Sequence, residues 1–163
     1  MQSDVRHGGL ILFVAGLVGL AGHSAFAQSK DDPLIGRWAM DRAKSEFSGA
    51  PPERRIAIFE LTTDGRMRHI TETLVANGST DRVEYTAKYD GQDNPISNSF
   101  LWTVSVKRID ARTSERSGKV NGEVVETSTR TVSADGQVLT ITTKGTNNGN
   151  EYSSVQVFTR ERS

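Results

Sequence analysis

The sequence predicts an all-β protein, a single antiparallel up-and-down barrel of about eight or nine strands. Asx-Gly dipeptides, which suit tight hairpin turns, recur at intervals of roughly 13 residues, apart from one longer gap. The runs between them are rich in Thr, Val, Ile and aromatic residues, which fit a pleated surface. Closure into a barrel would remove the exposed edges of so long a sheet. The dipeptides are Asp64-Gly65, Asn77-Gly78, Asp90-Gly91, Asn121-Gly122, Asp135-Gly136 and Asn148-Gly149.

Residues 1–27 are predicted to be a cleaved signal peptide. A short basic region around Arg6 precedes an apolar run from Leu10 to Ala21, and residues 25–27 (Ala-Phe-Ala) fit a small-x-small cleavage site. The alternative, a membrane anchor, needs about 20 apolar residues, and this run is shorter. The mature chain would then begin at Gln28 in the periplasm or the medium.

The remaining sequence predicts a polar linker over residues 28–33 and one barrel domain over residues 34–163. The whole chain carries 20 basic and 20 acidic residues, a formal net charge of zero, which gives no reason to expect a nucleic-acid partner. There is no Cys, so disulfides, thiol catalysis and cysteine–metal sites are excluded. No second apolar run follows the signal, and we expect no membrane insertion.

The strands follow one another in chain order. A first strand over Leu34–Met40 precedes one helical turn at residues 41–47, with Asp41 as its N-cap. Residues 54–63 carry apolar side chains on both parities, which predicts a β-bulge. A turn at Asp110 fills the long gap between Asx-Gly dipeptides, and a rim loop precedes it at residues 93–99. The later predicted strands are Arg66–Val75, Thr80–Tyr89, Phe100–Ile109, Arg112–Lys119, Glu123–Ser133, Gln137–Lys144 and Glu151–Arg160.

Alternation predicts which side chains face the interior. Val83, Tyr85, Ala87 and Tyr89 share one parity, with Glu84 on the other. Charged residues predicted to face outward argue against an outer-membrane barrel; they are Glu84, Lys88, Lys107 and Arg130. Several inward candidates are threonines, which either line a cavity or simply favour strands; they are Thr71, Thr73, Thr127, Thr129, Thr131 and Thr143.

Gly36-Arg37-Trp38, near the start of the predicted barrel, resembles the G-x-W motif of lipocalins. In that superfamily the Trp closes one end of the barrel, and a basic residue of the last strand packs across its ring. The resemblance implies that Trp38 has this role, with Arg160 or Arg162 as the cation–π partner.

Three longer stretches, at residues 36–48, 84–95 and 139–146, together resemble a family of small exported bacterial proteins built as lipocalin-like, calycin-type barrels. The resemblance runs over nearly the whole mature chain. Members of that family have no assigned activity, so it implies fold and export only. The sequence departs from the family's pattern at Met40-Asp41 and has a shorter segment before Phe100.

Aromatic side chains are the candidates for a ligand-binding wall, since aromatics commonly line pockets for apolar ligands. The same residues would equally suit a filled barrel core. The candidates are Tyr85, Tyr89, Phe100, Trp102 and Tyr152.

Catalytic and metal sites find little support in the sequence. His69 is the one histidine after the signal peptide, and we expect it to pack as an ordinary strand residue rather than bind haem. Asp90 and Asp93 could offer oxygens to Ca²⁺, but an Asx-turn explains them better. We therefore predict no catalytic residues, no metal and no cofactor.

The function that the sequence favours is non-enzymatic binding of a small apolar or amphipathic ligand in or at the barrel. The alternative is a module that docks or inhibits another exported protein, such as a protease, through its loops.

Overall fold

The structure, a computed structural model, describes residues 28–97, 99 and 102–162. The predicted signal peptide and the candidate residue Phe100 lie outside these residues. The described chain is all-β apart from one turn of 3-10 helix at Arg42–Lys44. None of its segments forms an apolar helix long enough to cross a membrane.

Eleven strands form one antiparallel sheet in the described part of the chain, which confirms the predicted all-β barrel but exceeds the predicted strand count. The two extra strands, β2 and β6, are short or polar and show no apolar alternation. The strands are β1 (Gly36–Met40), β2 (Glu46–Phe47), β3 (Arg54–Leu61), β4 (Met67–Leu74), β5 (Thr80–Ala87), β6 (Asp90–Pro95), β7 (Trp102–Arg108), β8 (Thr113–Val120), β9 (Glu123–Val132), β10 (Val138–Asn147) and β11 (Asn150–Arg160).

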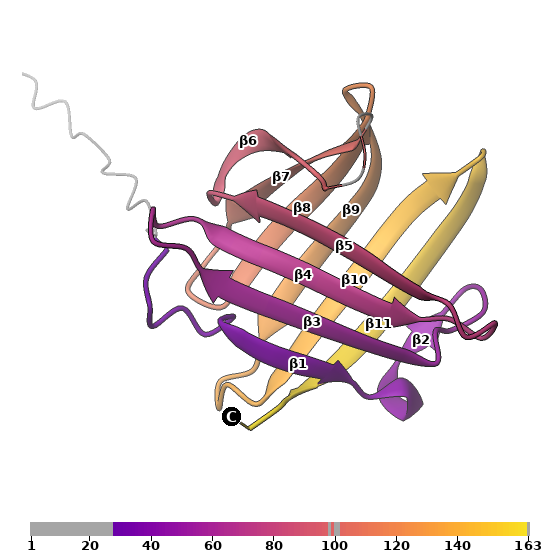
Figure 1. Cartoon of the computed structure of the whole chain (residues 1–163), viewed down its shortest axis with the longest axis horizontal. Helices are drawn as coiled ribbons and strands as arrows, with labels where there is room; N and C mark the ends of the chain where they lie inside the picture. Colours follow the sequence, from indigo (N-terminus) through magenta and orange to yellow (C-terminus); the bar gives the residue numbers. More distant parts are fainter. Residues whose placement is uncertain (1–27, 98, 100–101, 163) are drawn as a thin grey trace, which may run out of the picture.

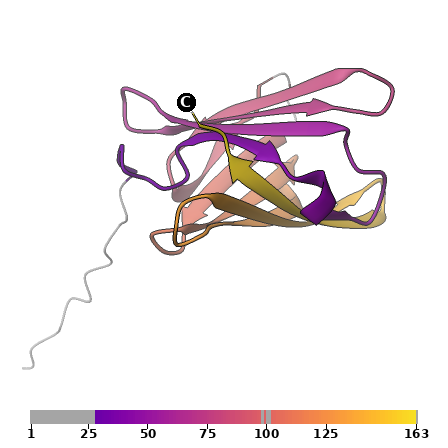
Figure 2. The same ribbon diagram turned by 90° about the horizontal axis from the view of Figure 1, so that it is seen from below.

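The sheet curls into a nearly closed antiparallel barrel. Its strand order is β5-β4-β3-β1-β11-β10-β9-β8-β7-β6, with β2 paired to β11. Strands β3–β5 form one wall, and β8–β11 form the other and cross behind them (Figures 1 and 2). The barrel closes where an isolated bridge joins Tyr85 to Ile96, and the Ser97 N–H donates to the Glu84 carbonyl at 2.8 Å.

The hairpin turns follow the Asx-Gly dipeptides except at Asp90-Gly91, where β6 begins. Asn121 and Asn148 have positive φ angles of 52° and 49°, as tight turns of this kind require. The turn predicted at Asp110 also forms, and the Asp110 Oδ1 accepts a hydrogen bond from the Arg112 N–H at 2.8 Å. The predicted rim loop is partly wrong, because its first residues belong to β6.

Two local predictions near the start of the barrel are wrong. β3 pairs with β4 in unbroken register from Arg54↔Leu74 to Leu61↔Met67, so it contains no bulge. Apolar residues occur on both parities because Ile56 is buried on the face of the strand opposite the barrel interior. Asp41 makes no side-chain cap and instead pairs with the Lys44 Nζ at 3.0 Å.

The apolar core lies in two clusters rather than filling the barrel. One closes an end of the barrel, and the other lies against the wall formed by β5 and β7. The first contains Leu34, Trp38, Ala57, Phe59, Met67, Val132, Leu139 and Phe158. The second contains Tyr85, Ala87, Ile96, Val104 and Val106.

Trp38 is the centre of the closed end and is fully buried. Its Nε1–H donates to the Leu34 carbonyl at 2.9 Å, and the Arg160 guanidinium lies 4.1 Å from the centre of its ring. Gly36 has a φ of +139°, and a Cβ there would lie 2.4 Å from the Arg160 Nη1. The glycine of the G-x-W motif therefore leaves the space that Arg160 occupies.

The segment predicted as a polar linker, residues 28–33, lies against the same end of the barrel. Asp32 forms an ion pair with Arg108, and both side chains are almost completely buried. The Asp32 Oδ1 also accepts a hydrogen bond from the Leu34 N–H at 2.9 Å. Because the pair is buried and hydrogen-bonded, it holds this segment to β7 and helps to close the end.

We expect Trp38→Ala to lower the free energy of unfolding by about 3–5 kcal/mol, since it leaves a large cavity at the closed end. Urea denaturation measures the loss. Ile109→Ala, at a residue 44% exposed, is the control and should change stability by about 0.5 kcal/mol or less. A loss below about 1 kcal/mol for Trp38→Ala would contradict its structural role.

Candidate ligand-binding cavity

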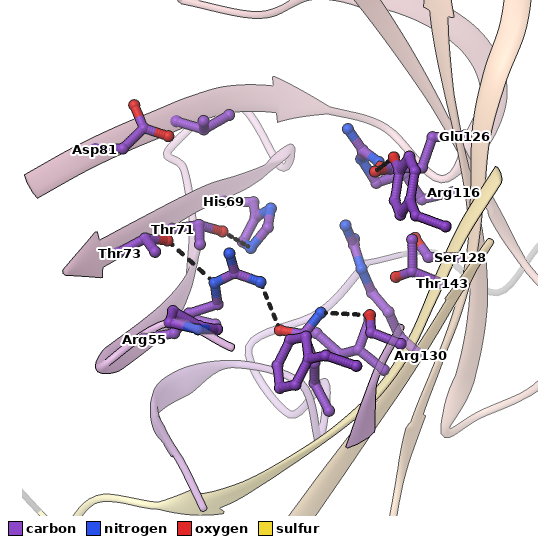
Figure 3. A pocket seen from close by; sticks show the side chains of 18 of the residues that line it. Arg55, His69, Thr71, Thr73, Asp81, Arg116, Glu126, Ser128, Arg130 and Thr143 are labelled. Atoms are coloured by element: carbon purple, nitrogen blue, oxygen red, sulfur yellow. Dashed lines mark hydrogen bonds and ion pairs between the residues drawn. The ribbon is translucent and has the colours of Figure 1, made fainter. Parts of the chain in front are cut away.

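A cavity of about 690 Å³ occupies the barrel interior above the closed end. It lies between the wall that carries Arg55 and His69 and the wall that carries Arg116 and Arg130 (Figure 3). It reaches the opposite end of the barrel, where residues 47–50 line it. Its lining combines apolar side chains, some of them from the two clusters, with many polar and charged ones.

Alternate residues on each strand point into the cavity, as a pleated wall requires. On β4 they are His69, Thr71 and Thr73, and on β9 they are Glu126, Ser128 and Arg130. Thr71, Thr73 and Thr143 therefore face inward as predicted.

The prediction of which β9 side chains face the barrel interior is wrong. Thr127, Thr129 and Thr131 are exposed, and Arg130, predicted to face outward, is only 3% exposed and lies inside. The inner residues of β9 are mostly polar, so apolar alternation gave no signal there. Glu84, by contrast, lies on the outer face as predicted and binds the Arg68 Nε at 2.6 Å.

Near the open end, Glu126 connects two neighbouring side chains. It forms an ion pair with Arg116, and its Oε2 accepts a hydrogen bond from the Tyr152 hydroxyl at 2.5 Å. Burial and this contact with Glu126 raise the pKa of Tyr152 above its ordinary value. The Tyr152 ring lies against Gly145, where a Cβ would come within 2.7 Å of it. Gly145 thus gives Tyr152 the room to reach Glu126.

Arg116 and Arg55 differ in how their charge is balanced. Burial lowers the pKa of Arg116, but Tyr85 and Glu126 outweigh it and hold that pKa above its ordinary value. Burial lowers the pKa of Arg55, and the carboxylates of Glu126 and Asp81 only partly oppose this. The Arg55 guanidinium donates to neutral groups on its neighbours, to the Thr73 Oγ1 at 3.0 Å and to the Gln156 Oε1 at 2.7 Å.

Arg130 lies at the floor of the cavity. Its Nη2 donates to the Tyr85 hydroxyl at 2.6 Å, while its Nε and Nη1 are buried without a hydrogen-bond partner among the described residues. Its guanidinium carbon is 5.5 Å from the centre of the Phe59 ring and 5.9 Å from that of Tyr85. These rings offset part of the cost of burying the charge.

His69 packs between aromatic rings beside this floor. It stacks on Phe59 at 4.4 Å and meets Tyr85 edge-on at 5.0 Å, and one ring nitrogen, Nε2, lies 3.1 Å from the Thr71 hydroxyl. Burial, together with the positive charges of Arg130 and Arg116, holds the pKa of His69 well below its ordinary value. The imidazole is therefore neutral at pH 7.

The aromatic candidates divide into three groups. Tyr85, Trp102 and Tyr152 line the cavity. Tyr89 follows the end of β5 and does not line it; its ring lies 4.5 Å from the guanidinium carbon of Arg108 near the closed end. Phe100 lies outside the described residues.

The sequence analysis did not predict four charged residues that line the cavity, because a charged residue on a strand ordinarily lies on its outer face. They are Arg55, Arg116, Arg130 and Glu126.

The described residues contain no group of three His, Asp or Glu side chains that could hold a metal ion. Asp93 instead pairs with the Lys119 Nζ at 2.7 Å, and the Asp90 Oδ1 accepts a hydrogen bond from the Gln92 N–H at 3.0 Å. The second of these contacts is an Asx-turn.

No known protein family matches the sequence, and neither does any curated protein. Among solved structures, the fold is similar to that of the wild-type fluorescent protein UnaG, with a TM-score of 0.53 and 14% identity over 78% of this chain and 97% of UnaG. The UnaG N57A mutant gives a TM-score of 0.54 and 13% identity, over 80% and 98% of the two chains. A tryptamine complex of the amine binding protein of Rhodnius prolixus gives a TM-score of 0.44 and 13% identity, over 84% and 68%.

At these identities the likeness to UnaG concerns the fold alone. It agrees with the strand order in showing a nearly closed antiparallel barrel.

The neutral, buried His69 should make stability depend on pH. Its pKa is depressed in the folded state, so below about pH 6.5 the unfolded chain binds more protons and stability falls as pH falls. We expect a contribution of up to about 1.4 kcal/mol per pH unit between about pH 6.5 and 5. Urea denaturation across this range measures it, and His69→Gln should remove it. Equal slopes for the two proteins would show that His69 does not cause the effect.

Proposed function

We propose that this protein binds a small amphipathic molecule inside its barrel. The observation that carries the proposal is the cavity of about 690 Å³, which lies within the range of roughly 300–1,000 Å³ typical of small-molecule sites. A barrel core that served only stability would fill this space with apolar side chains. Here the apolar clusters stop at the closed end and at one wall, and polar groups converge on the remaining volume.

The lining supports a ligand that is partly polar and partly apolar. Val83, Trp102 and Ile141 offer apolar surface, while hydroxyl, amide and guanidinium groups supply directed hydrogen bonds. This combination of apolar walls with a few convergent polar groups is the usual composition of a binding pocket.

We propose binding rather than catalysis. A nucleophile or general base needs an activating partner within hydrogen-bond reach. The Thr71 hydroxyl lies within reach of His69, but the His69 Nδ1 has no partner among the described residues that would orient the ring as a base. Glu126 is already engaged by Arg116 and Tyr152. These contacts hold the titratable groups in fixed roles and favour a static binding wall.

A filled cavity should abolish binding of an apolar probe. Ser128→Phe places a bulky ring inside the cavity, whereas Thr129→Phe places the same ring on the exposed face of the same strand. We expect the neutral fluorophore N-phenylnaphthylamine to bind the wild-type protein and Thr129→Phe equally, and Ser128→Phe at least about tenfold more weakly because the probe's volume is excluded. Fluorescence titration measures this, and equal binding by all three proteins would refute an interior site.

We also propose that the barrel works outside the cytoplasm, on the basis of the signal-like residues 1–27. Expression of the full chain in a bacterial host should yield a periplasmic or secreted product that begins at Gln28. Intact-mass measurement of the fractionated protein tests this, with Ala25→Arg as the variant expected to block cleavage. A cytoplasmic, uncleaved wild-type chain would refute the proposal.

A further inference from the structure

The charges of the cavity do not balance. Arg55, Arg116 and Arg130 all line it, and Glu126 neutralises Arg116. The other lining carboxylate, Asp81, lies at an exposed position of β5. Within the described part of the chain, neither Arg55 nor Arg130 forms an ion pair with a carboxylate. The interior therefore holds more positive than negative charge.

The excess charge is least compensated at Arg130. A guanidinium stays protonated at any ordinary pH and presents five N–H donors. Arg130 uses one nitrogen on the Tyr85 hydroxyl, and its Nε and Nη1 are buried without partners among the described residues. A buried charge with unsatisfied donors is strongly unfavourable, so it needs an acceptor from outside the chain.

The neighbours of Arg130 suit an anionic acceptor. The Tyr85 hydroxyl accepts from Arg130 and keeps its own proton free to donate to a second group. The neutral His69 has a buried Nδ1 without a partner among the described residues, and it lies against the Tyr85 ring. Arg55, across the cavity on β3, adds a second guanidinium that is paired only with neutral groups (Figure 3).

The depth of these groups sets the orientation of the ligand. Arg130 lies on the floor near Phe59, whereas Trp102, Tyr152 and residues 47–50 line the cavity at positions nearer its open end. A ligand with a negative group at one end and an apolar body would place the charge at the floor and the body against the aromatic side chains above it.

We propose that the ligand is an organic anion whose carboxylate or sulfonate-type group binds Arg130 and Tyr85 at the floor of the barrel. This inference rests on the proposed function, ligand binding inside the barrel, and names the chemical class of the ligand. An end-on contact, to one N–H each of Nη1 and Nη2, would give the partnerless Nη1 of Arg130 a charged acceptor. Positively charged ligands are disfavoured by the same guanidinium groups.

Two matched fluorophores separate this inference from the general proposal. Anilinonaphthalene sulfonate and N-phenylnaphthylamine share the same aromatic body, and only the first carries a sulfonate. We expect the wild-type protein to bind the sulfonate at least about tenfold more tightly than the neutral probe, as a charge-assisted contact would give. Equal affinity for the two would overturn the anion site while leaving the barrel-binding proposal intact. Failure to bind either would overturn both.

Variants of Arg130 test the residue itself. Arg130→Met should remove most of the preference for the sulfonate and change neutral-probe affinity less than about threefold, while Arg130→Lys should keep part of it. Arg66→Met is the control, because it removes the same charge from an exposed turn where Arg66 pairs with Asp64. Equal weakening of both probes by Arg130→Met would mean that Arg130 acts on the shape of the cavity and would overturn its role as the anion-binding residue.

Thermal melts of the unliganded proteins add a readout independent of the probes. Arg130→Met removes a buried unpaired charge, so its melting temperature should equal or exceed that of the wild type. A large fall would mean that Arg130 is already satisfied within the folded chain, which contradicts the inference.

Competition experiments identify the anionic group that the site prefers. Dodecanoate, dodecyl phosphate and neutral dodecanol are each added to the protein with anilinonaphthalene sulfonate bound. Effective competition by dodecanol alone would also overturn the inference.

Discussion

The closed end of the barrel depends on the contact between Trp38 and Arg160. The guanidinium lies over the Trp38 ring, its Nε donates to the Gly136 carbonyl at 2.7 Å, and its Nη1 donates to the Ile35 carbonyl at 2.6 Å. One side chain thus joins the last strand, the β9–β10 turn and the segment before β1. Because these parts are distant in sequence, the contact closes one end of the barrel. The opposite end, which residues 47–50 line, remains the way into the cavity.

The polar interior follows from where the apolar core ends. Phe59, Val132 and Leu139 fill the space beside Trp38, and two to four residues further along the same strands the inward side chains become Arg, Ser and Thr. Such a gradient costs stability, since burying polar groups is unfavourable unless each finds a partner. Arg116, Glu126 and Tyr152 satisfy one another near the open end. The unsatisfied groups collect lower down, around Arg130 and His69.

The sequence predicted the fold well because turns and apolar alternation report on it directly. The Asx-Gly dipeptides placed most hairpins, and alternation on β5 correctly placed Tyr85 inside and Glu84 outside. The same reasoning failed on β9, where Thr129 was expected inside and Arg130 outside. Alternation assigns a face by its apolar residues, so it carries no information where the inner face is itself polar. The positions that were hardest to predict are therefore those that define the candidate site.

Arg130 shows most clearly that the interior is not arranged for stability alone. Glu126 faces the interior on β9, four residues before Arg130. Its carboxylate pairs with Arg116 of the neighbouring strand β8. Replacing Ser128 by an acidic residue, or Arg130 by an apolar one, would be a simple way to remove the unpaired charge. Proteins in which apolar groups replace a buried ion pair are often more stable. Proteins depart from such local optima mainly where function requires it. A guanidinium that the folded chain surrounds with aromatic rings and one hydroxyl, but leaves without a counter-charge, is arranged to receive that charge from a bound molecule.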